Sequence, residues 1–140
     1  MIKTKNYWLV HNFIIHYYNK MNNLHKRFAL FLVCISVRFS IAFLAKGARD
    51  GLLQAIGFLS LMPAIGFFYL FFSGKRKTGR ETFGDKIWWN NLRPVHGTLW
   101  LLFAFYALRK NTNAWIFLLA DVLIGLLSFL SFHIKSIQNL

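Results

Sequence analysis

Four long runs of apolar residues divide the chain. They cover residues 28–45, 51–73, 95–108 and 114–134. A helix needs about 20 consecutive apolar residues to cross the hydrocarbon core of a bilayer. The second and fourth runs reach that length and the first comes near it, whereas the third is short unless Pro94 and His96 also lie at membrane depth. The pattern therefore predicts an all-α polytopic membrane protein with about four transmembrane helices.

Composition separates this interpretation from its alternative, a compact helical domain in water. The chain of 140 residues is 56% hydrophobic and only 15% charged, with a formal net charge of +13, whereas an ordinary soluble domain carries roughly 25% charged residues. So much apolar surface does not fit inside one small core, and it also excludes intrinsic disorder. A water-soluble enzyme is therefore not expected. The single cysteine, Cys34, excludes an internal disulfide.

Residues 1–27 predict a separate element. Apolar and aromatic residues recur there at helical spacing, namely Tyr7, Val10, Ile14, Tyr17, Tyr18, Met21 and Leu24. Such a pattern is typical of an amphipathic helix that lies in the membrane interface. We therefore divide the chain into this segment and a transmembrane domain, residues 28–140. An alternative stays open, in which Met21 starts the protein and residues 1–20 are an extension.

Basic residues set the expected orientation, because cytoplasmic loops of membrane proteins carry an excess of lysine and arginine. If all four runs cross, the N-terminal segment, the loop 74–94 and the C-terminal segment share one side and hold twelve basic residues. The opposite side holds four. This bias predicts that both termini lie on the cytosolic side, and it depends on residues 95–108 crossing fully.

The loop 74–94 is the densest cluster of polar residues, and its basic block consists of Lys75, Arg76, Lys77 and Arg80. Such a block attracts anionic headgroups by roughly 1 kcal/mol per basic residue, and Trp88 and Trp89 suit the boundary between water and lipid. We group these residues with Asn90, Arg93 and His96 as a candidate site for headgroups or a partner protein. Two interpretations stay open: a lipid-anchored connecting loop, or a folded headpiece that recognises a partner.

Three ionisable residues fall within or beside the apolar runs, namely Arg38, His96 and Asp121. A charge in lipid is costly, so each should face the helix bundle and find a partner. At ~1.5 Å per residue, Arg38 lies about 15 Å into the first run, and Asp121 lies about 10 Å into the fourth from the other side. In a core ~30 Å thick these depths are similar, which predicts an Arg38–Asp121 ion pair. A proton relay through Asp121 and His96 is the functional alternative.

Small residues recur on the second and fourth runs, where Gly57, Ser60 and Ala64 and then Gly125 and Ser128 follow helical spacing. Small residues allow helices to approach closely in lipid. The sequence shows no phosphate-cradling glycine loop, no catalytic Ser/His/Asp spacing and no metal-ligand pattern. No enzyme activity, cofactor or metal site is therefore predicted.

One stretch suggests a family. Residues 79–121, and most specifically WWNNLRPVH at 88–96, resemble small multispan membrane proteins of large DNA viruses that infect algae and protists. The resemblance implies a virion or host-membrane setting, in which a minor virion protein ties an inner membrane to a capsid shell. It implies no catalytic roles for any residue.

These patterns favour an integral membrane protein with a structural or interaction role. Its expected partners are the bilayer, anionic headgroups and neighbouring membrane or capsid proteins, and a homo-oligomer is compatible with helices this short. Nucleic acid is not an expected partner, because membrane topology already explains the basic residues. The alternative function is a small proton or ion transporter or channel subunit that uses Asp121 and His96.

Overall fold

The computed structural model describes residues 3–78 and 87–138, with the side chains at both ends of the chain left undescribed. The described chain is all-helical, as the apolar pattern predicts. Its elements are α1 (Lys3–Gly47), α2 (Asp50–Leu59), α3 (Leu61–Ser73), the short 3-10 helix η2 (Asn90–Leu92), α4 (Arg93–Leu108), the 3-10 helix η3 (Thr112–Ala114) and α5 (Trp115–Gln138).

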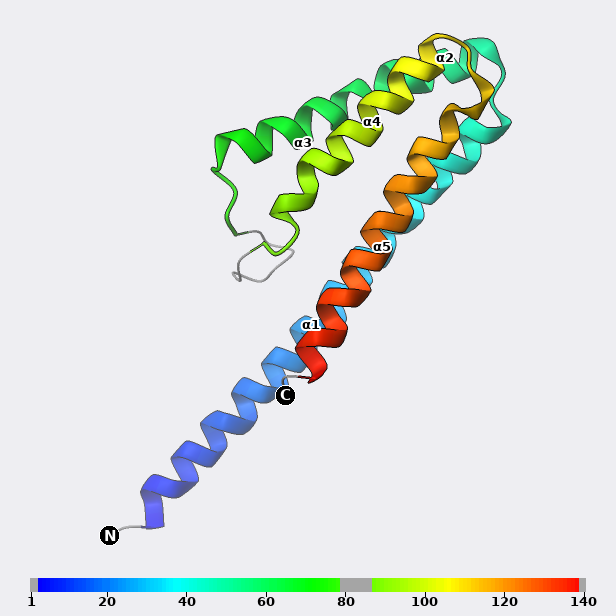
Figure 1. Ribbon diagram of the computed structural model, residues 1–140. Coiled ribbons are helices and arrows are strands. Elements are labelled where there is room, and N and C mark those ends of the chain that lie inside the picture. Colours follow the sequence, from blue (N-terminus) through cyan, green and yellow to red (C-terminus); the bar gives the residue numbers. More distant parts are fainter. Residues whose placement is uncertain (1–2, 79–86, 139–140) are drawn as a thin grey trace.

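The helices form two packed pairs that join at one end of the molecule (Figure 1). In the first pair, α5 runs back along α1. In the second, α4 runs back along α2 and α3, and α4 also packs against α5. The turns after α1 and after α4 lie together at what we call the turn end, where Lys110 Nζ and Asp50 Oδ2 are 3.7 Å apart. The start of α1, the end of α5 and residues 74–78 and 87–92 lie towards the other end, the loop end.

Helices α2 and α3 act almost as one rod with a joint at Ser60. The Ser60 backbone N–H and hydroxyl both donate to the Ile56 carbonyl, at 3.0 and 2.7 Å. Three residues later, Pro63 has no N–H to donate to the Leu59 carbonyl, so the regular helical ladder is interrupted there. Together α2 and α3 form one apolar stretch, Asp50–Ser73, that is long enough to span a membrane.

Three stretches are long and apolar enough to cross a bilayer, namely His25–Gly47, Asp50–Ser73 and Thr112–Ile134. They correspond to the first, second and fourth predicted runs. The third run is also a helix, but α4 has only 16 residues, or about 24 Å at the helical rise. Large apolar side chains such as Phe43, Met62 and Phe72 are more than two-thirds exposed, which fits a surface that faces lipid instead of water.

The N-terminal segment is helical as predicted, but residue 27 does not mark a break. Helix α1 runs without interruption from Lys3 to Gly47, a length of about 68 Å at the helical rise. An interfacial helix in the membrane plane would need a bend before the first span, and α1 shows no break in its helix there. The position of residues 1–27 in the membrane interface stays a prediction.

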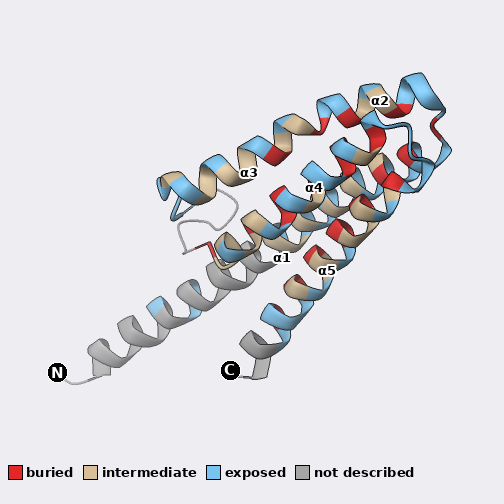
Figure 2. Ribbon diagram, turned by 45° about the horizontal axis from the view of Figure 1, so that its top comes forward, coloured by how far each residue is buried: buried red, intermediate tan, exposed pale blue. Residues whose placement is uncertain are grey.

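The best-packed core lies at the turn end and is built largely from alanine. Its fully buried residues include Ala45 on α1, Leu53 on α2 and Phe103 and Ala107 on α4. A Cβ added to Gly57 would lie only 2.8 Å from the Ala107 Cβ. Small residues therefore let α2 and α4 approach closely, as their spacing in the sequence predicts. Buried residues line the facing sides of the helices, and the outer faces are exposed (Figure 2).

Candidate functional site

A buried polar cluster joins three helices near the middle of the molecule. Asp121 on α5 is completely buried. Its Oδ2 accepts a hydrogen bond from Arg38 Nη1 on α1 at 3.1 Å, and its Oδ1 lies 2.5 Å from His96 Nδ1 on α4. We call Arg38, His96 and Asp121 the Asp121 cluster. Each carboxylate oxygen therefore has a partner on a different helix.

The contact between His96 and Asp121 bears on which ring nitrogen of His96 carries a hydrogen. An ionised carboxylate only accepts hydrogen bonds, so a hydrogen bond to an ionised Asp121 requires the hydrogen on His96 Nδ1. Arg38 Nη1 is 3.5 Å from the same Nδ1, and that approach is a contact between two donors. Arginine and aspartate then compensate each other's charge, which a buried ion pair requires.

Neighbouring residues shape the space around the cluster. Gly125, one turn after Asp121, has no side chain, and a Cβ there would lie 3.7 Å from His96 Cε1 and 3.4 Å from Ile35 Cδ1. Phe67 on α3 places its ring centroid 5.3 Å from Arg38 Cζ and 5.7 Å from the centre of the His96 ring. The cluster is thus enclosed by side chains from α1, α3, α4 and α5.

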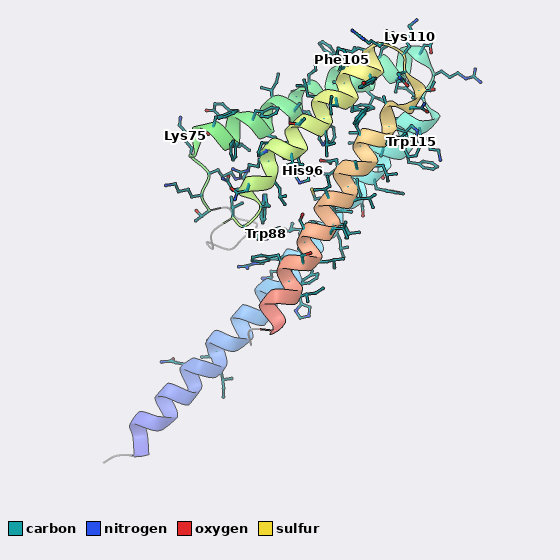
Figure 3. The ribbon with its side chains drawn as sticks, viewed as in Figure 1. Lys75, Trp88, His96, Phe105, Lys110 and Trp115 are labelled. Carbon is teal, nitrogen blue, oxygen red and sulfur yellow. The ribbon has the colours of Figure 1, made fainter. Side chains whose placement is uncertain are left out.

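The structure brings Arg38 and Asp121 together as their depths predict, and it places His96 beside Asp121. The sequence groups His96 with the loop residues that would meet headgroups or a partner and, as an alternative, with Asp121 in a proton relay. In the structure His96 is only 6% exposed and points from α4 towards α5 (Figure 3). The reason is local: α4 begins at Arg93, so the His96 side chain already lies on a helical turn that packs against α5. Proline is common in the first turn of a helix, so the position of His96 two residues after Pro94 was the sequence signal that could have placed it on α4.

Arg93 also has a role inside the fold. It is 3% exposed, and its Nη1 donates to the Asn90 side-chain oxygen at 2.8 Å and to the Leu70 carbonyl at 3.3 Å. These bonds tie the start of α4 to the last turns of α3. Arg93 and Asn90 therefore stabilise the α3–α4 connection, whatever they contact beyond it.

The tryptophans of the loop pack differently from the basic block. Trp88 stacks on Phe132 of α5, with ring centroids 4.7 Å apart and planes within 7°, and Trp89 meets Trp88 edge to face at 5.4 Å. Figure 3 shows Trp88 beside α5. Lys75, Arg76 and Lys77 are exposed. Arg80 lies outside the described residues.

A cavity of about 550 Å³ lies between the two helix pairs on the loop side of the Asp121 cluster. Arg38 and His96 line it, as do Arg27 on α1, Arg76 and Arg93. Aromatic rings from α1, α3, α5 and the loop form much of its wall. We call this space the basic cavity. Sequence patterns did not reveal it.

The described residues offer no group of three or more His, Cys, Asp and Glu side chains placed to hold a metal ion. The cluster can supply an ion pair, a histidine with one ring nitrogen engaged, and polar groups at a cavity wall. Comparison of the chain with protein-family models, curated proteins and solved structures found no match.

Proposed function

We propose that the chain is an integral membrane structural or interaction protein whose helix pairs are held together inside the bilayer by the Asp121 cluster. In the proposed topology, α1, the α2–α3 rod, α4 and α5 each cross the membrane. Both termini and the 74–92 segment then lie on the cytosolic side. The shared turn end and the twelve-to-four distribution of basic residues support this arrangement.

The observation that carries the structural role is the complete burial of Asp121 with both oxygens occupied. A charge at membrane depth is costly unless it is paired. Breaking a buried pair by removing one partner leaves the other charge uncompensated. Because the partners come from α1 and α4, the cluster holds together elements that are distant in sequence.

The interaction role rests on the exposed basic residues of the loop end. Lys75 and Lys77 are exposed beside the last turn of α3, where each would contribute roughly 1 kcal/mol of attraction to an anionic membrane surface. A partner protein would meet the same surface. The viral membrane setting that the resemblance implies belongs to this proposal and needs its own test in infected cells.

Asp121→Asn separates the structural role from a relay. The substitution removes the charge that pairs with Arg38, so we expect a large loss of monodisperse protein in detergent, measured by size-exclusion chromatography. Asp50→Asn is the matched control, because Asp50 is exposed and its ion pair with Lys110 lies at the surface. Normal folding of Asp121→Asn would contradict the structural role.

Topology is tested separately with single cysteines placed in a Cys34→Ala background. Lys77→Cys and Asn111→Cys lie at opposite ends of the molecule, and both original side chains are exposed. We expect an impermeant thiol reagent to reach only one of them from outside sealed vesicles. Labelling of both from the same side would overturn the proposed topology.

A small proton or ion transporter is the second candidate, favoured by the position of His96 between Asp121 and the basic cavity. Proton flux across liposomes that contain the wild-type chain tests it directly. The structural proposal expects flux no higher than in empty liposomes. Flux that Asp121→Asn abolishes without loss of folded protein would favour the transporter.

A further inference from the structure

Helix α1 carries one stripe of residues that are spaced alternately three and four positions apart. Within the bundle the stripe consists of Phe28, Phe31, Ile35, Arg38, Ala42 and Ala45. The rings of Phe28 and Phe31 lie against Phe129 of α5, Arg38 binds Asp121 of α5, and the two alanines are buried. This is the spacing of a helix that packs along another helix, as in a coiled coil.

The same spacing continues beyond the bundle. Counted backwards from Phe28, it reaches Leu24, Met21, Tyr17, Ile14, Val10 and Tyr7. Polar residues recur every seven positions on the opposite face, at Lys5, Asn12, Asn19 and Lys26. We call the whole stripe the α1 seam. Its period does not change at the point where α1 leaves the bundle, because α1 is one continuous helix.

Helix α5 covers only part of the α1 seam. His133 lies beside Phe28, with ring centroids 4.8 Å apart, and the described part of α5 ends at Gln138. At ~1.5 Å per residue this end is level with about residue 23 of α1. Figure 1 shows α1 continuing well past it. Ile14, on the outer seam, is 58% exposed, and an apolar stripe on a helix normally faces another element.

We propose that residues 7–17 pair with the same segment of a second copy of this chain, in an antiparallel two-helix coil. The argument is continuity with an interface already present in the fold. Inside the bundle an antiparallel helix, α5, covers the α1 seam, and the outer seam has the same spacing for the same kind of partner. The inference rests on the proposed crossing of the bilayer by α1.

Charge favours a second copy over other partners. Residues 7–17 contain no lysine, arginine, aspartate or glutamate. Two copies therefore bring no like charges together in this segment, although the whole chain has a formal charge of +13. The segment also offers no lysine or arginine for an acidic protein or an anionic headgroup to recognise.

A second copy fits in one direction. A parallel partner that followed the α1 seam towards the bilayer would meet α5, which already covers the seam there. An antiparallel partner leads away from the first bundle. In this direction Tyr7 lies opposite the partner's Tyr17, and Val10 lies opposite the partner's Ile14, so that apolar positions of one copy meet apolar positions of the other.

The pairing has a consequence for the membrane. The spans of two antiparallel copies point in opposite directions, so both copies do not fit in one flat bilayer with the same orientation. The pair joins two bilayers whose cytosolic faces meet. The apolar span of α1 begins at His25, and in the proposed register the two His25 positions are about 40 Å apart along the coil at the helical rise.

Clustering of liposomes tests the pairing. The full-length chain is reconstituted in dioleoylphosphatidylcholine liposomes that carry either a donor or an acceptor dye, and clustering is followed by energy transfer. We expect clustering only when both populations contain the protein. Clustering with protein-free liposomes would show that the segment inserts into a bilayer instead, and it would overturn the inference.

Two neighbouring isoleucines provide the variant and its control. Ile14 lies on the α1 seam, whereas Ile15, which is 45% exposed, does not. Ile14→Asp places a carboxylate in the paired face and should weaken clustering at least about tenfold. Ile15→Asp adds the same charge one position away and should stay within about twofold of wild type. Equal effects of the two variants would contradict pairing through the seam.

Cross-linking tests the direction of the pair. Tyr7→Cys and Tyr17→Cys are made in a Cys34→Ala background, one of them with a size tag, and the mixture is oxidised in detergent. Like positions are about 15 Å apart in the antiparallel coil, which is too far for a disulfide. We therefore expect at least about fivefold more of the mixed disulfide than of either self-linked product. Predominant self-linking would show a parallel pair.

These outcomes are independent of the structural role of the Asp121 cluster. Wild-type protein that is folded but neither clusters liposomes nor forms the mixed disulfide would overturn the inference. That result would leave the folding test of Asp121→Asn unaffected. If Ile14→Asp does not fold, the protein-free liposomes and the cysteine pair still decide.

Discussion

The turn end and the loop end of this bundle are built from different residues. At the turn end, alanines and glycine bring helix backbones close together, as between Gly57 and Ala107. At the loop end, aromatic rings and arginines surround a cavity of about 550 Å³. The Asp121 cluster lies where the two regions meet. Close packing holds one end, and a few polar and aromatic contacts hold the other.

This difference follows from what stabilises helices in lipid. Lipid tails are as apolar as leucine, so helices associate through close van der Waals contact and internal polar bonds and not through burial from water. Small residues at the turn end supply the first kind of contact. The Asp121 cluster supplies the second, and it allows the helix pairs to separate beyond it without losing their connection. A cavity next to a rigid core is the result.

The largest expected effect is at the junction of the two regions. Asp121→Leu leaves Arg38, whose side chain is only 17% exposed, without its carboxylate, so we expect a loss of about 3–5 kcal/mol in the free energy of unfolding. Ser128→Leu, on the same helix and half-buried, controls for added bulk. Unfolding in mixed detergent micelles, followed by circular dichroism, measures both. Similar losses for the two variants would argue against a special role for Asp121.

At the turn end, extra volume should be the damaging change. A side chain at Gly57 would meet the Ala107 Cβ at 2.8 Å, so Gly57→Val should cost about 1–3 kcal/mol through overpacking. A Cβ added to Gly66 on α3 would have no neighbouring atom within 4 Å, and Gly66→Val is therefore the matched control. The same unfolding assay compares them, and equal stability of the two variants would mean that α2 and α4 are not closely packed.

At the loop end, removing the Trp88 ring should lower the free energy of unfolding less than the two changes above, and it should open the cavity. Trp88→Ala removes the stack on Phe132, which is worth about 1 kcal/mol beyond its buried area. We expect faster maleimide labelling of Cys34, which lines the cavity, in this variant. Tyr69→Ala removes an exposed ring of α3 and should leave the rate unchanged. Unchanged labelling after Trp88→Ala would show that the loop does not close the cavity.

The smallest effect is expected at the surface of the turn end. The Asp50–Lys110 pair is 3.7 Å apart, with side chains 65% and 54% exposed. Exposed pairs of this kind contribute about 0–1 kcal/mol, so Asp50→Asn should be nearly silent in the unfolding assay. A loss as large as that of Asp121→Leu would mean that burial does not explain the difference between the two acidic residues.

Much of the helical fold could be predicted from the sequence, because long runs of apolar residues with at most one charge have few other stable solutions. The Arg38–Asp121 pair also followed from helical depth, since rise per residue converts position into height. The sequence grouped His96 with the loop residues and, as an alternative, with Asp121, and the structure shows the contact with Asp121. The role of His96 depends on which face of α4 meets α5, and a single short run does not encode that.

The cavity could not be predicted, because it depends on how far two helix pairs diverge. Arg27 and Arg76 are 49 positions apart in the chain, and their sequence contexts indicate only a membrane boundary. The fold brings both to one wall. The boundary at residue 27 between the interfacial segment and the transmembrane domain stays a prediction, because α1 continues through it as one helix.

A double-mutant cycle between Arg38 and Asp121 tests the central claim most directly. Arg38→Leu, Asp121→Leu and the double variant are unfolded in the same micelles as the wild type. Because an apolar pair can replace a buried ion pair at little cost, we predict that the double variant is more stable than Asp121→Leu alone, with a coupling energy of about 2 kcal/mol or more. Single effects that add to within about 0.5 kcal/mol would show that the two side chains do not hold the helices together.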